Sequence, residues 1–343
     1  METVSEIQAA RAIAILLPKM VHAGVTVAGV VAGFTVAVSA VTVLEGLWAR
    51  DRLLAAGYST ESVSSVDDFG GDYDGGRLEL ALLGDSLAVG VGAGSPEATV
   101  GFLLAEGLAR TARRPVRLHN VAVVGSQSSE LAEQLRALDE SGVRPDVAVI
   151  VVGGNDVMHL QSIPAAAKYL AHIVRKLRRQ GTHVVVATCP DMGTVRPFFQ
   201  PLRFFAHWLS RFLATTQTIV VLRNGGRAVS LADTVGPIFR HAPRLMFSND
   251  SLHPSALGYA RAAEVLLPSV CAAAGYLRDG TGSVPHRIYR KGGHYPLAWF
   301  AFRASREPGT ELTPAHDRHG RPAFFSGRPA FLNGLTLPNR QHA

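Results

Sequence analysis

The sequence has few cysteines and lacks the residue patterns that bind metals, phosphates or dinucleotides. Its two cysteines, Cys189 and Cys271, have no metal or redox spacing. We expect both to be buried small apolar residues, with a disulfide left open. No Gly-Lys-Ser/Thr run occurs, and the glycines of GVGAG at 90–94 come too late after their strand for a dinucleotide fingerprint. His253 has one acidic neighbour and no further ligand at a suitable spacing. We therefore predict chemistry without a metal or a cofactor.

Charge is also scarce over most of the chain. Charged residues make up 18% of the sequence, and the net charge of +7 is concentrated at its end. Residues 278–343 contain nine Arg and Lys291 against four acidic residues. Because the preceding part is close to neutral, a basic face for nucleic acid is not indicated. We interpret the tail as an extension whose charged side chains are solvated or contact anionic lipid.

One long uncharged stretch lies near the start, at residues 20–44. Its 25 residues exceed the roughly 20 needed to cross a bilayer. Three interpretations stay open: an uncleaved membrane anchor, a signal peptide cleaved after Val38-Ser39-Ala40, or a helix packed on the following domain. The first two would make the protein membrane-anchored or exported, with the side of the membrane not set by the flanking charges.

The composition divides the chain into four regions. Residues 1–48 form an N-terminal hydrophobic segment, and residues 49–77 are rich in Ser, Gly and Asp, which is typical of a flexible linker. A domain with regular patterning covers residues 78–276. Residues 277–343 are basic and rich in Pro and Gly without periodicity, so we expect a disordered tail.

Strands and helices alternate in the domain. Five short apolar stretches predict strands, at Leu78–Leu83, Val116–Val123, Val147–Val152, His183–Thr188 and Ala228–Leu231. Helical stretches follow near Glu97–Thr111, Ser129–Glu140, Ile163–Gln180, Pro201–Asn224 and Ser255–Ala274. This order predicts an α/β fold with a parallel sheet covered on both faces. Ligands bind at the carboxyl ends of the strands in such sheets.

Polar groups suited to acyl transfer fall at those strand ends. Ser86 follows the first predicted strand, and its hydroxyl becomes a nucleophile once a base removes its proton. Asn155 follows the third strand after two glycines, so its amide can donate to a developing oxyanion. The backbone N–H groups of Gly125 and Ser86 are further donors. Each motif alone has a plainer explanation, such as an ordinary turn.

His253 is the candidate base. Asp250 lies three residues before it, and a helical or 3₁₀-like turn would point both side chains the same way. The carboxylate then accepts from the Nδ1–H of the imidazole, which leaves Nε2 to take the Ser86 proton. Taken alone, the Asp-x-x-His pattern also fits a helix N-terminus.

Four segments of the chain resemble the conserved blocks of the SGNH/GDSL hydrolase family, in its order and spacing. They are Gly84-Asp85-Ser86-Leu87, Gly125, Gly153-x-Asn155-Asp156 and Asp250-x-x-His253-Pro254. The resemblance covers about residues 78–276. It implies a flavodoxin-like three-layer α/β/α sandwich with a five-stranded parallel sheet, here preceded by an N-terminal hydrophobic helix. The Cys189-Pro190-Asp191 turn and the Ala/Val/Gly-rich start are similar to exported actinobacterial members.

The resemblance also implies roles for these residues. Ser86 would be the nucleophile, Asp250 and His253 would complete a triad, and Ser86, Gly125 and Asn155 would form the oxyanion hole, without a cofactor. The expected activity is hydrolysis of carboxylic esters, with a small-molecule or lipid substrate such as a cell-envelope acyl ester. Two alternatives use the same residues: O-acyl transfer to an envelope carbohydrate or lipid, and a non-catalytic binding module.

Aromatic residues follow the fourth predicted strand. Phe198, Phe199, Phe204 and Phe205 either line an acyl pocket or lid, or pack in the core. The sequence favours neither interpretation over the other. It does not indicate an oligomeric state.

Overall fold

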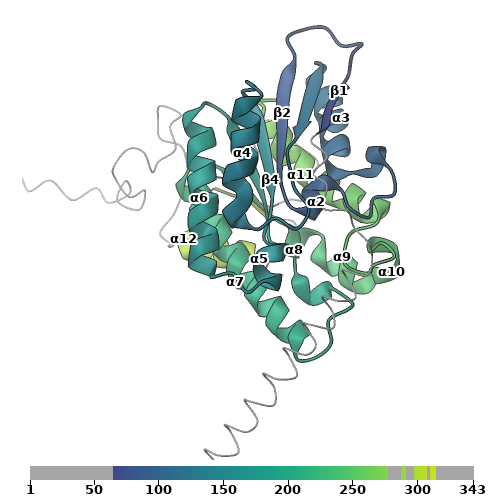
Figure 1. Ribbon diagram of the computed structural model, residues 1–343, viewed down its shortest axis with the longest axis vertical. Helices are drawn as coiled ribbons and strands as arrows, with labels where there is room; N and C mark the ends of the chain where they lie inside the picture. Colours follow the sequence, from purple (N-terminus) through teal and green to yellow (C-terminus); the bar gives the residue numbers. More distant parts are fainter. Residues whose placement is uncertain (1–64, 277–286, 291–296, 307–309, 314–343) are drawn as a thin grey trace, which may run out of the picture. The chain divides into compact units, whose positions relative to one another are not determined.

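The computed structural model describes residues 65–276, 287–290, 297–306 and 310–313 (Figure 1). The predicted hydrophobic helix within residues 1–48 lies outside these ranges, as does the whole of the stretch 20–44. Within the described ranges, none of the helices combines the length and the apolar character needed to span a membrane.

The sheet contains all five predicted strands, but it is larger than predicted. The described part of the chain has eight strands: β1 (Ser65–Phe69), β2 (Leu78–Gly84), β3 (Val116–Asn120), β4 (Val147–Val151), β5 (His183–Thr188), β6 (Arg227–Ser230), β7 (Arg287–Arg290) and β8 (Thr310–Thr313). Their spatial order is β1-β3-β2-β4-β5-β6-β8-β7. Strands β2 to β6 are mutually parallel. Their order, with the second strand outside the first, is that of flavodoxin-like sheets.

Three strands at the edges correct the prediction of a five-stranded parallel sheet. β1 pairs antiparallel with β3, β8 pairs antiparallel with β6, and β7 pairs parallel with β8. The sheet is therefore mixed. β1 lies in the segment predicted as a flexible linker, and its polar sequence SVDDF suits an exposed edge strand in which only Phe69 is buried.

Among the residues that the structure describes, five long helices cover the two faces of the sheet (Figure 1). They are α3 (Val100–Ala112), α4 (Leu131–Glu140), α6 (Ile163–Arg179), α7 (Leu202–Arg223) and α11 (Ala256–Ala273). Side chains of α3 and α11 pack with Leu80 and Leu82 of β2 in one core cluster. Those of α4, α6 and α7 pack with Ala81 and Leu83 in another. Successive β2 residues thus face opposite layers, which explains why the strand is apolar throughout.

The shorter elements join these layers. They are α2 (Ser86–Val89), η1 (Pro96–Ala98), η2 (Ser128–Glu130), α5 (Gly154–Met158), η3 (Met192–Thr194), α8 (Leu231–Thr234), α9 (Gly236–His241), α10 (Pro243–Met246) and α12 (Leu297–Ala304). The elements α12, β7 and β8 lie in the tail for which no regular structure was predicted. Leu297, Ala304 and Leu312 of this tail form a small core with Leu222 of α7. For these segments the prediction of a disordered tail is wrong.

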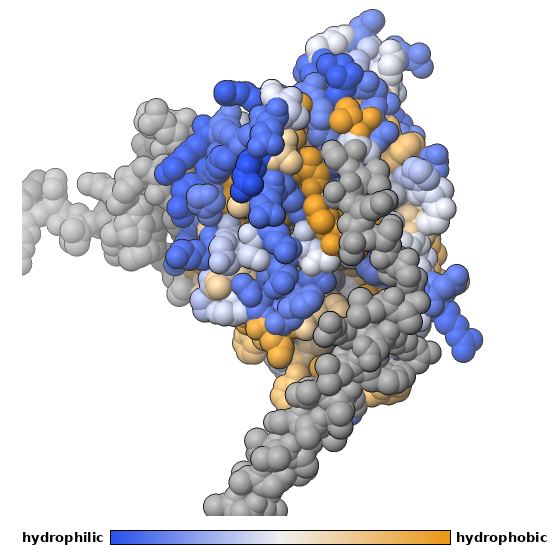
Figure 2. Space-filling view, in the orientation of Figure 1, coloured by the Kyte–Doolittle hydropathy of each residue, from blue (hydrophilic) through white to orange (hydrophobic). Residues whose placement is uncertain are grey.

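The surface over α4 and α6 is mainly hydrophilic, whereas hydrophobic side chains gather around the lower end of α7 (Figure 2). Phe204 and Phe205 of this helix are 55% and 48% exposed. The core-packing interpretation is therefore wrong for these two residues. Residues 198–202 belong to a different compact unit from the sheet domain and are described separately. In that segment Phe198 is buried and Phe199 is exposed.

Candidate active site

The carboxyl end of β2 places Ser86 at the first position of the short helix α2. Asp85 is the N-cap of this helix, and its Oδ1 accepts from the backbone N–H of Leu87 at 2.9 Å. The N–H of Asp85 donates to the carbonyl of Val151 at the end of β4, at 3.0 Å. The Ser86 hydroxyl is thus held on a capped turn at the strand ends, where α/β sheets bind ligands.

A continuous hydrogen-bonded chain connects Asp250, His253 and Ser86. Nδ1 of His253 lies 2.5 Å from Oδ2 of Asp250, and Nε2 lies 2.9 Å from Oγ of Ser86. All three residues are largely shielded from solvent. A carboxylate on Nδ1 fixes the tautomer in which Nε2 carries the lone pair, so Nε2 can accept the hydroxyl proton.

The turn that carries Asp250 and His253 differs from the predicted helical one. Ser251 between them has φ of +59°, in the left-handed region. Oδ1 of Asp250 accepts from the N–H groups of Leu252 and His253 at 2.9 and 3.0 Å, and from Oγ of Ser248 at 2.6 Å. These hydrogen bonds wrap the turn around the Asp250 carboxylate, so the pairing of Asp250 with His253 does not require a helix. The alternative of a helix N-terminus is also wrong, because α11 begins at Ala256 with Ser255 as its N-cap.

Gly125 and Asn155 follow β3 and β4 at the same edge of the sheet. Val123 donates to the carbonyl of Gly84 at 3.1 Å, which holds the Gly125 loop beside the β2 end. The Asn155 amide donates to the carbonyl of Ser126 at 3.2 Å. Its nitrogen carries a second hydrogen for a ligand. In the part of the chain that the structure describes, the N–H groups of Ser86 and Gly125 have no protein acceptor. These bonds place the loops that carry Gly125 and Asn155 beside the end of β2.

Two further carboxyl groups are buried under these segments. Burial raises the pKa of Asp85 to about 7, against the opposing effect of backbone hydrogen bonds from Leu87 and Gly153. Burial also raises the pKa of Asp156, which accepts from the backbone and the hydroxyl of Ser128. Asp156 thus ties η2 to α5.

A hollow of about 390 Å³ adjoins Gly125. Its lining is largely apolar and comes from the loop after β3, from η2 and from α4, with two acidic residues among the ten: Val121, Ala122, Val123, Val124, Gly125, Ser126, Glu130, Glu133, Gln134 and Ala137. None of the four phenylalanines predicted as pocket residues contributes to it. Their role in substrate binding stays a prediction.

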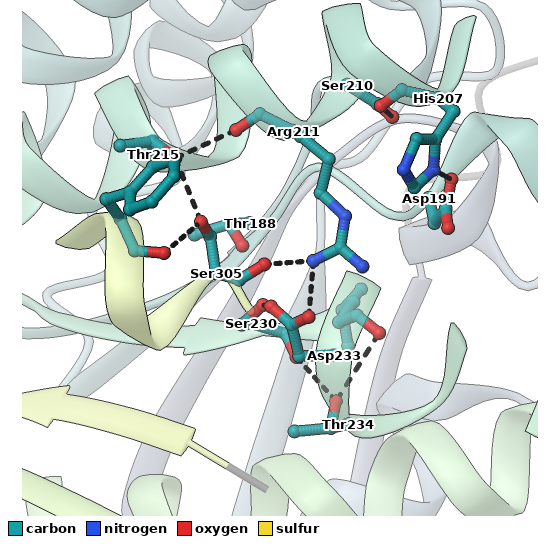
Figure 3. A network of polar contacts seen from close by, with 12 residues as sticks. Thr188, Asp191, His207, Ser210, Arg211, Thr215, Ser230, Asp233, Thr234 and Ser305 are labelled. Atoms are coloured by element: carbon teal, nitrogen blue, oxygen red, sulfur yellow. Dashed lines mark hydrogen bonds and ion pairs between the residues drawn. The ribbon is translucent and has the colours of Figure 1, made fainter. Parts of the chain in front are cut away.

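A second polar network lies beyond the ends of β5 and β6 (Figure 3). The Arg211 guanidinium of α7 donates to the Asp233 carboxylate and to the Ser305 carbonyl, which joins α7, α8 and the residue after α12. Ser230 donates to Asp233 at 2.6 Å. Nearby, His207 pairs with the buried Asp191 at 2.8 Å. This network fastens the tail elements onto the domain.

Cys189 and Cys271 are free and buried, as predicted. Burial raises the pKa of the Cys189 thiol, which keeps it protonated and unreactive. In residues 65–276 and the three described tail segments, no cluster of three or more His, Cys, Asp or Glu residues is arranged to hold a metal ion.

Sequence reasoning missed several residues that hold the site together. Ser248 and Ser128 orient Asp250 and Asp156, and serines in turns carry no signal for such a role. Gln134 and Gln217 do carry one, because each is a polar residue at a core position of a helix. Gln134 falls between Leu131 and Leu138, on the buried face of α4.

Several known proteins are similar to this chain. A lipase from a goat rumen metagenome aligns over 59% of this chain and 99% of its own, with 21% identity and a TM-score of 0.47. A structure described as TesA aligns over 57% and 99%, with 20% identity and a TM-score of 0.47.

A curated relative is closer in sequence. The GDSL-like esterase Rv1075c of Mycobacterium tuberculosis is 44% identical over 189 residues. The match covers 55% of this chain and only 60% of the length of that relative. The GDSL-like Lipase/Acylhydrolase family model matches residues 82–261, just over half of the 343 residues. The protein therefore belongs to the GDSL-like lipase/acylhydrolase family.

Proposed function

We propose that the protein hydrolyses carboxylic esters through an acyl-enzyme on Ser86. The observation that carries the proposal is the hydrogen-bonded chain from Asp250 through His253 to the Ser86 hydroxyl, with contacts of 2.5 and 2.9 Å. The 44% identical relative is described as an esterase, which supports the same reaction.

In the first step, Oγ of Ser86 attacks the ester carbonyl carbon while Nε2 of His253 takes the hydroxyl proton. Asp250 stabilises the imidazolium and keeps the ring oriented. The carbonyl π-electrons move onto oxygen, and the N–H groups of Ser86 and Gly125 and the Asn155 amide stabilise that charge. The intermediate then expels the alkoxide, which leaves as an alcohol with the proton from His253.

In the second step, water takes the place of the alcohol. His253 removes a proton from water, and the hydroxide attacks the acyl carbon of the ester on Ser86. The second intermediate collapses, the acid departs, and Oγ regains its proton from His253. Each cycle consumes one ester and one water and needs no redox partner or cofactor.

The substrates proposed are lipid or cell-envelope acyl esters. The exposed Phe204 and Phe205 on α7 support a substrate with an apolar acyl group, because neighbouring aromatic side chains exposed on a protein surface favour the binding of apolar ligands. A series of p-nitrophenyl esters of two to sixteen carbons tests the proposal. Selectivity for medium or long chains that weakens in Phe204→Ala and Phe205→Ala is expected, whereas a strict preference for acetate would contradict it.

The nucleophile can be tested with a fluorophosphonate probe. We expect the wild-type protein to be labelled, Ser86→Ala not to be labelled, and Asn155→Ala to be labelled more slowly. The loss of one oxyanion donor is expected to lower kcat about 100- to 1000-fold. An unlabelled wild-type protein with a normal unfolding transition would overturn the proposal. Product analysis with added alcohols separates hydrolysis from acyl transfer.

Residues 20–44 are proposed to attach the protein to a membrane or to direct its export. The support is their length and lack of charge. Fractionation of cells that produce the full chain, compared with a chain lacking residues 1–48, tests this. Equal distribution of the two chains between membrane and soluble fractions would contradict it.

A further inference from the structure

The central strands leave no room for a side chain at two glycines beside the candidate site. A Cβ atom on Gly84 would lie 1.9 Å from the carbonyl oxygen of Val151, and one on Gly153 would lie 2.8 Å from Cβ of Cys189. Both glycines have positive φ values, +140° and +134°. After these positions the strands stop and their backbone groups need new partners.

Gln134 of α4 supplies partners at the β2 end. The N–H of Gly84 donates to its Oε1 at 2.8 Å, and its Nε2 donates to the carbonyl of Gly84 at 2.8 Å. The same Nε2 donates to Oγ of Ser126 at 3.0 Å. The Ser126 carbonyl in turn accepts from Asn155. One buried amide thus joins the segments that carry Ser86, Gly125 and Asn155.

Gln217 of α7 does the same at the ends of β4 and β5. Its Oε1 accepts from the N–H of Cys189 at 2.7 Å, and its Nε2 donates to the carbonyl of Val152 at 3.0 Å. Val152 lies three residues before Asn155. Gln217 is fully buried, and Gln134 is 4% exposed.

The chemistry of these contacts requires an amide side chain. Each glutamine meets one backbone N–H donor and one backbone C=O acceptor, both on Gly84 for Gln134 and on Cys189 and Val152 for Gln217. A neutral carboxamide offers an acceptor atom and a donor atom side by side. A carboxylate provides only acceptors and an ammonium only donors. A buried group with unmatched partners is costly, so few other residues fit here.

We propose that Gln134 and Gln217 are positioning residues that set the geometry of the oxyanion hole by binding the ends of β2, β4 and β5. Neither touches the reacting atoms. The expected effect on kcat rests on the proposed ester hydrolysis. The positioning of the strand ends can be measured whether or not the protein hydrolyses esters.

Gln134→Met and Gln217→Met keep the length of each side chain and remove its hydrogen bonds. Thr218→Val is the matched control, because Thr218 is buried next to Gln217 and bonds only within α7, to the carbonyl of Ala214. The glutamine variants are expected to lower kcat about 10- to 100-fold with KM changed less than about threefold, a part of the effect of losing one oxyanion donor. The control is expected to retain kcat.

Amide hydrogen exchange provides the readout that does not depend on activity. Exchange of the Gly84 N–H is expected to accelerate at least tenfold in Gln134→Met, and that of the Cys189 N–H in Gln217→Met. Amides in the centre of β4 should be unchanged. Gln134→Glu and Gln217→Glu keep the acceptor and should protect these amides more than the methionine variants do. If a methionine variant does not fold, the glutamate variant is compared with the wild-type protein instead, and its amide is expected to exchange faster than in the wild type.

The outcomes separate the two proposals. Unchanged exchange at both amides, or unchanged kcat in both glutamine variants of an active enzyme, would overturn the positioning role. A wild-type protein without hydrolysis or probe labelling would overturn the proposed function, while accelerated local exchange would still support the positioning.

Discussion

At the scale of single residues, Asp250 is the most connected member of the site. Its carboxylate accepts from His253, Leu252 and Ser248. Asp250→Asn keeps the size, and the N–H groups of Leu252 and His253 hold its oxygen at the Oδ1 position. Its N–H₂ group then faces Nδ1, which favours the wrong tautomer. We expect kcat to fall about 10⁴-fold with little change in KM. Hydrolysis of a soluble ester by the purified variant measures this. A loss of less than tenfold would mean that His253 does not depend on the carboxylate.

Asp85 predicts a pH dependence of stability. Its pKa is about 7 in the folded protein because of burial, whereas an unfolded Asp has a pKa of about 3.9. Between these values the folded state holds a proton that the unfolded state has lost, so the free energy of unfolding decreases as pH rises. The contribution is present in full below pH 4 and is lost by about pH 7, and it amounts to roughly 4 kcal/mol.

Asp85→Asn tests this dependence, since Asn is an equally good N-cap residue. Urea unfolding of both proteins at several values between pH 4.5 and 7.5 is the measurement. The free energy of unfolding of the wild-type protein should decrease more steeply with pH than that of the variant. Parallel curves would show that Asp85 does not titrate in this range.

The residues of the site differ in how far the sequence could predict them. Ser86, Gly125, Asn155, Asp250 and His253 stand in short motifs after apolar strands, and the structure brings their segments together. Their catalytic roles stay predictions. The turn at Ser251 could not be predicted, because a left-handed serine depends on the hydrogen bonds that Asp250 makes. The partners of Gln134 and Gln217 are backbone groups 50 and 65 positions away in sequence, which no local pattern reveals.

At the scale of elements, Arg211 joins α7 to α8 and to the end of α12 (Figure 3). Asp233 is 3% exposed, and burial raises its pKa despite the arginine beside it. Arg211→Met leaves this carboxyl group without its cation, so we expect a loss of about 3 kcal/mol in the free energy of unfolding.

A double-mutant cycle measures the interaction between Arg211 and Asp233. Adding Asp233→Asn to Arg211→Met removes the buried charge and is expected to restore part of the lost stability. Thermal or urea unfolding of the two single variants and the double variant gives the coupling. Additive effects of the two substitutions would mean that the ion pair contributes nothing beyond its separate contacts.

The central elements were predictable because burial on both faces makes their strands continuously apolar. The edge strands lack this signal. Ser65–Phe69 has two consecutive aspartates, and Asp68 pairs with Arg117 of β3 on the exposed side. β7 and β8 have four residues each and depend on β6 for their place in the sheet. The composition of such segments is typical of a linker or a tail. Their pairing with neighbouring strands identifies them as part of the sheet.

At the scale of the whole molecule, the tail completes the sheet. β8 covers the outer edge of β6, and its Glu311 pairs with Arg227 at 3.0 Å with the carboxylate buried. A chain that ends at Tyr276 loses β7, α12 and β8, which exposes the β6 edge and removes the Glu311 carboxylate. Loss of one partner of a buried ion pair costs about 3–5 kcal/mol, and an uncovered strand edge promotes association.

We therefore expect the chain ending at Tyr276 to unfold at a lower urea concentration and to associate as its concentration rises. Urea unfolding and size-exclusion chromatography are the measurements. A chain that ends at Thr313 keeps all described elements and is the matched control, with an unfolding midpoint expected to equal that of the full chain. Because the Ser86–His253 contact joins the end of β2 to the turn before α11, folded molecules of the shorter chain should still react with the fluorophosphonate probe. If both truncated chains unfold at the same urea concentration as the full chain, the tail elements add nothing to the stability of the domain.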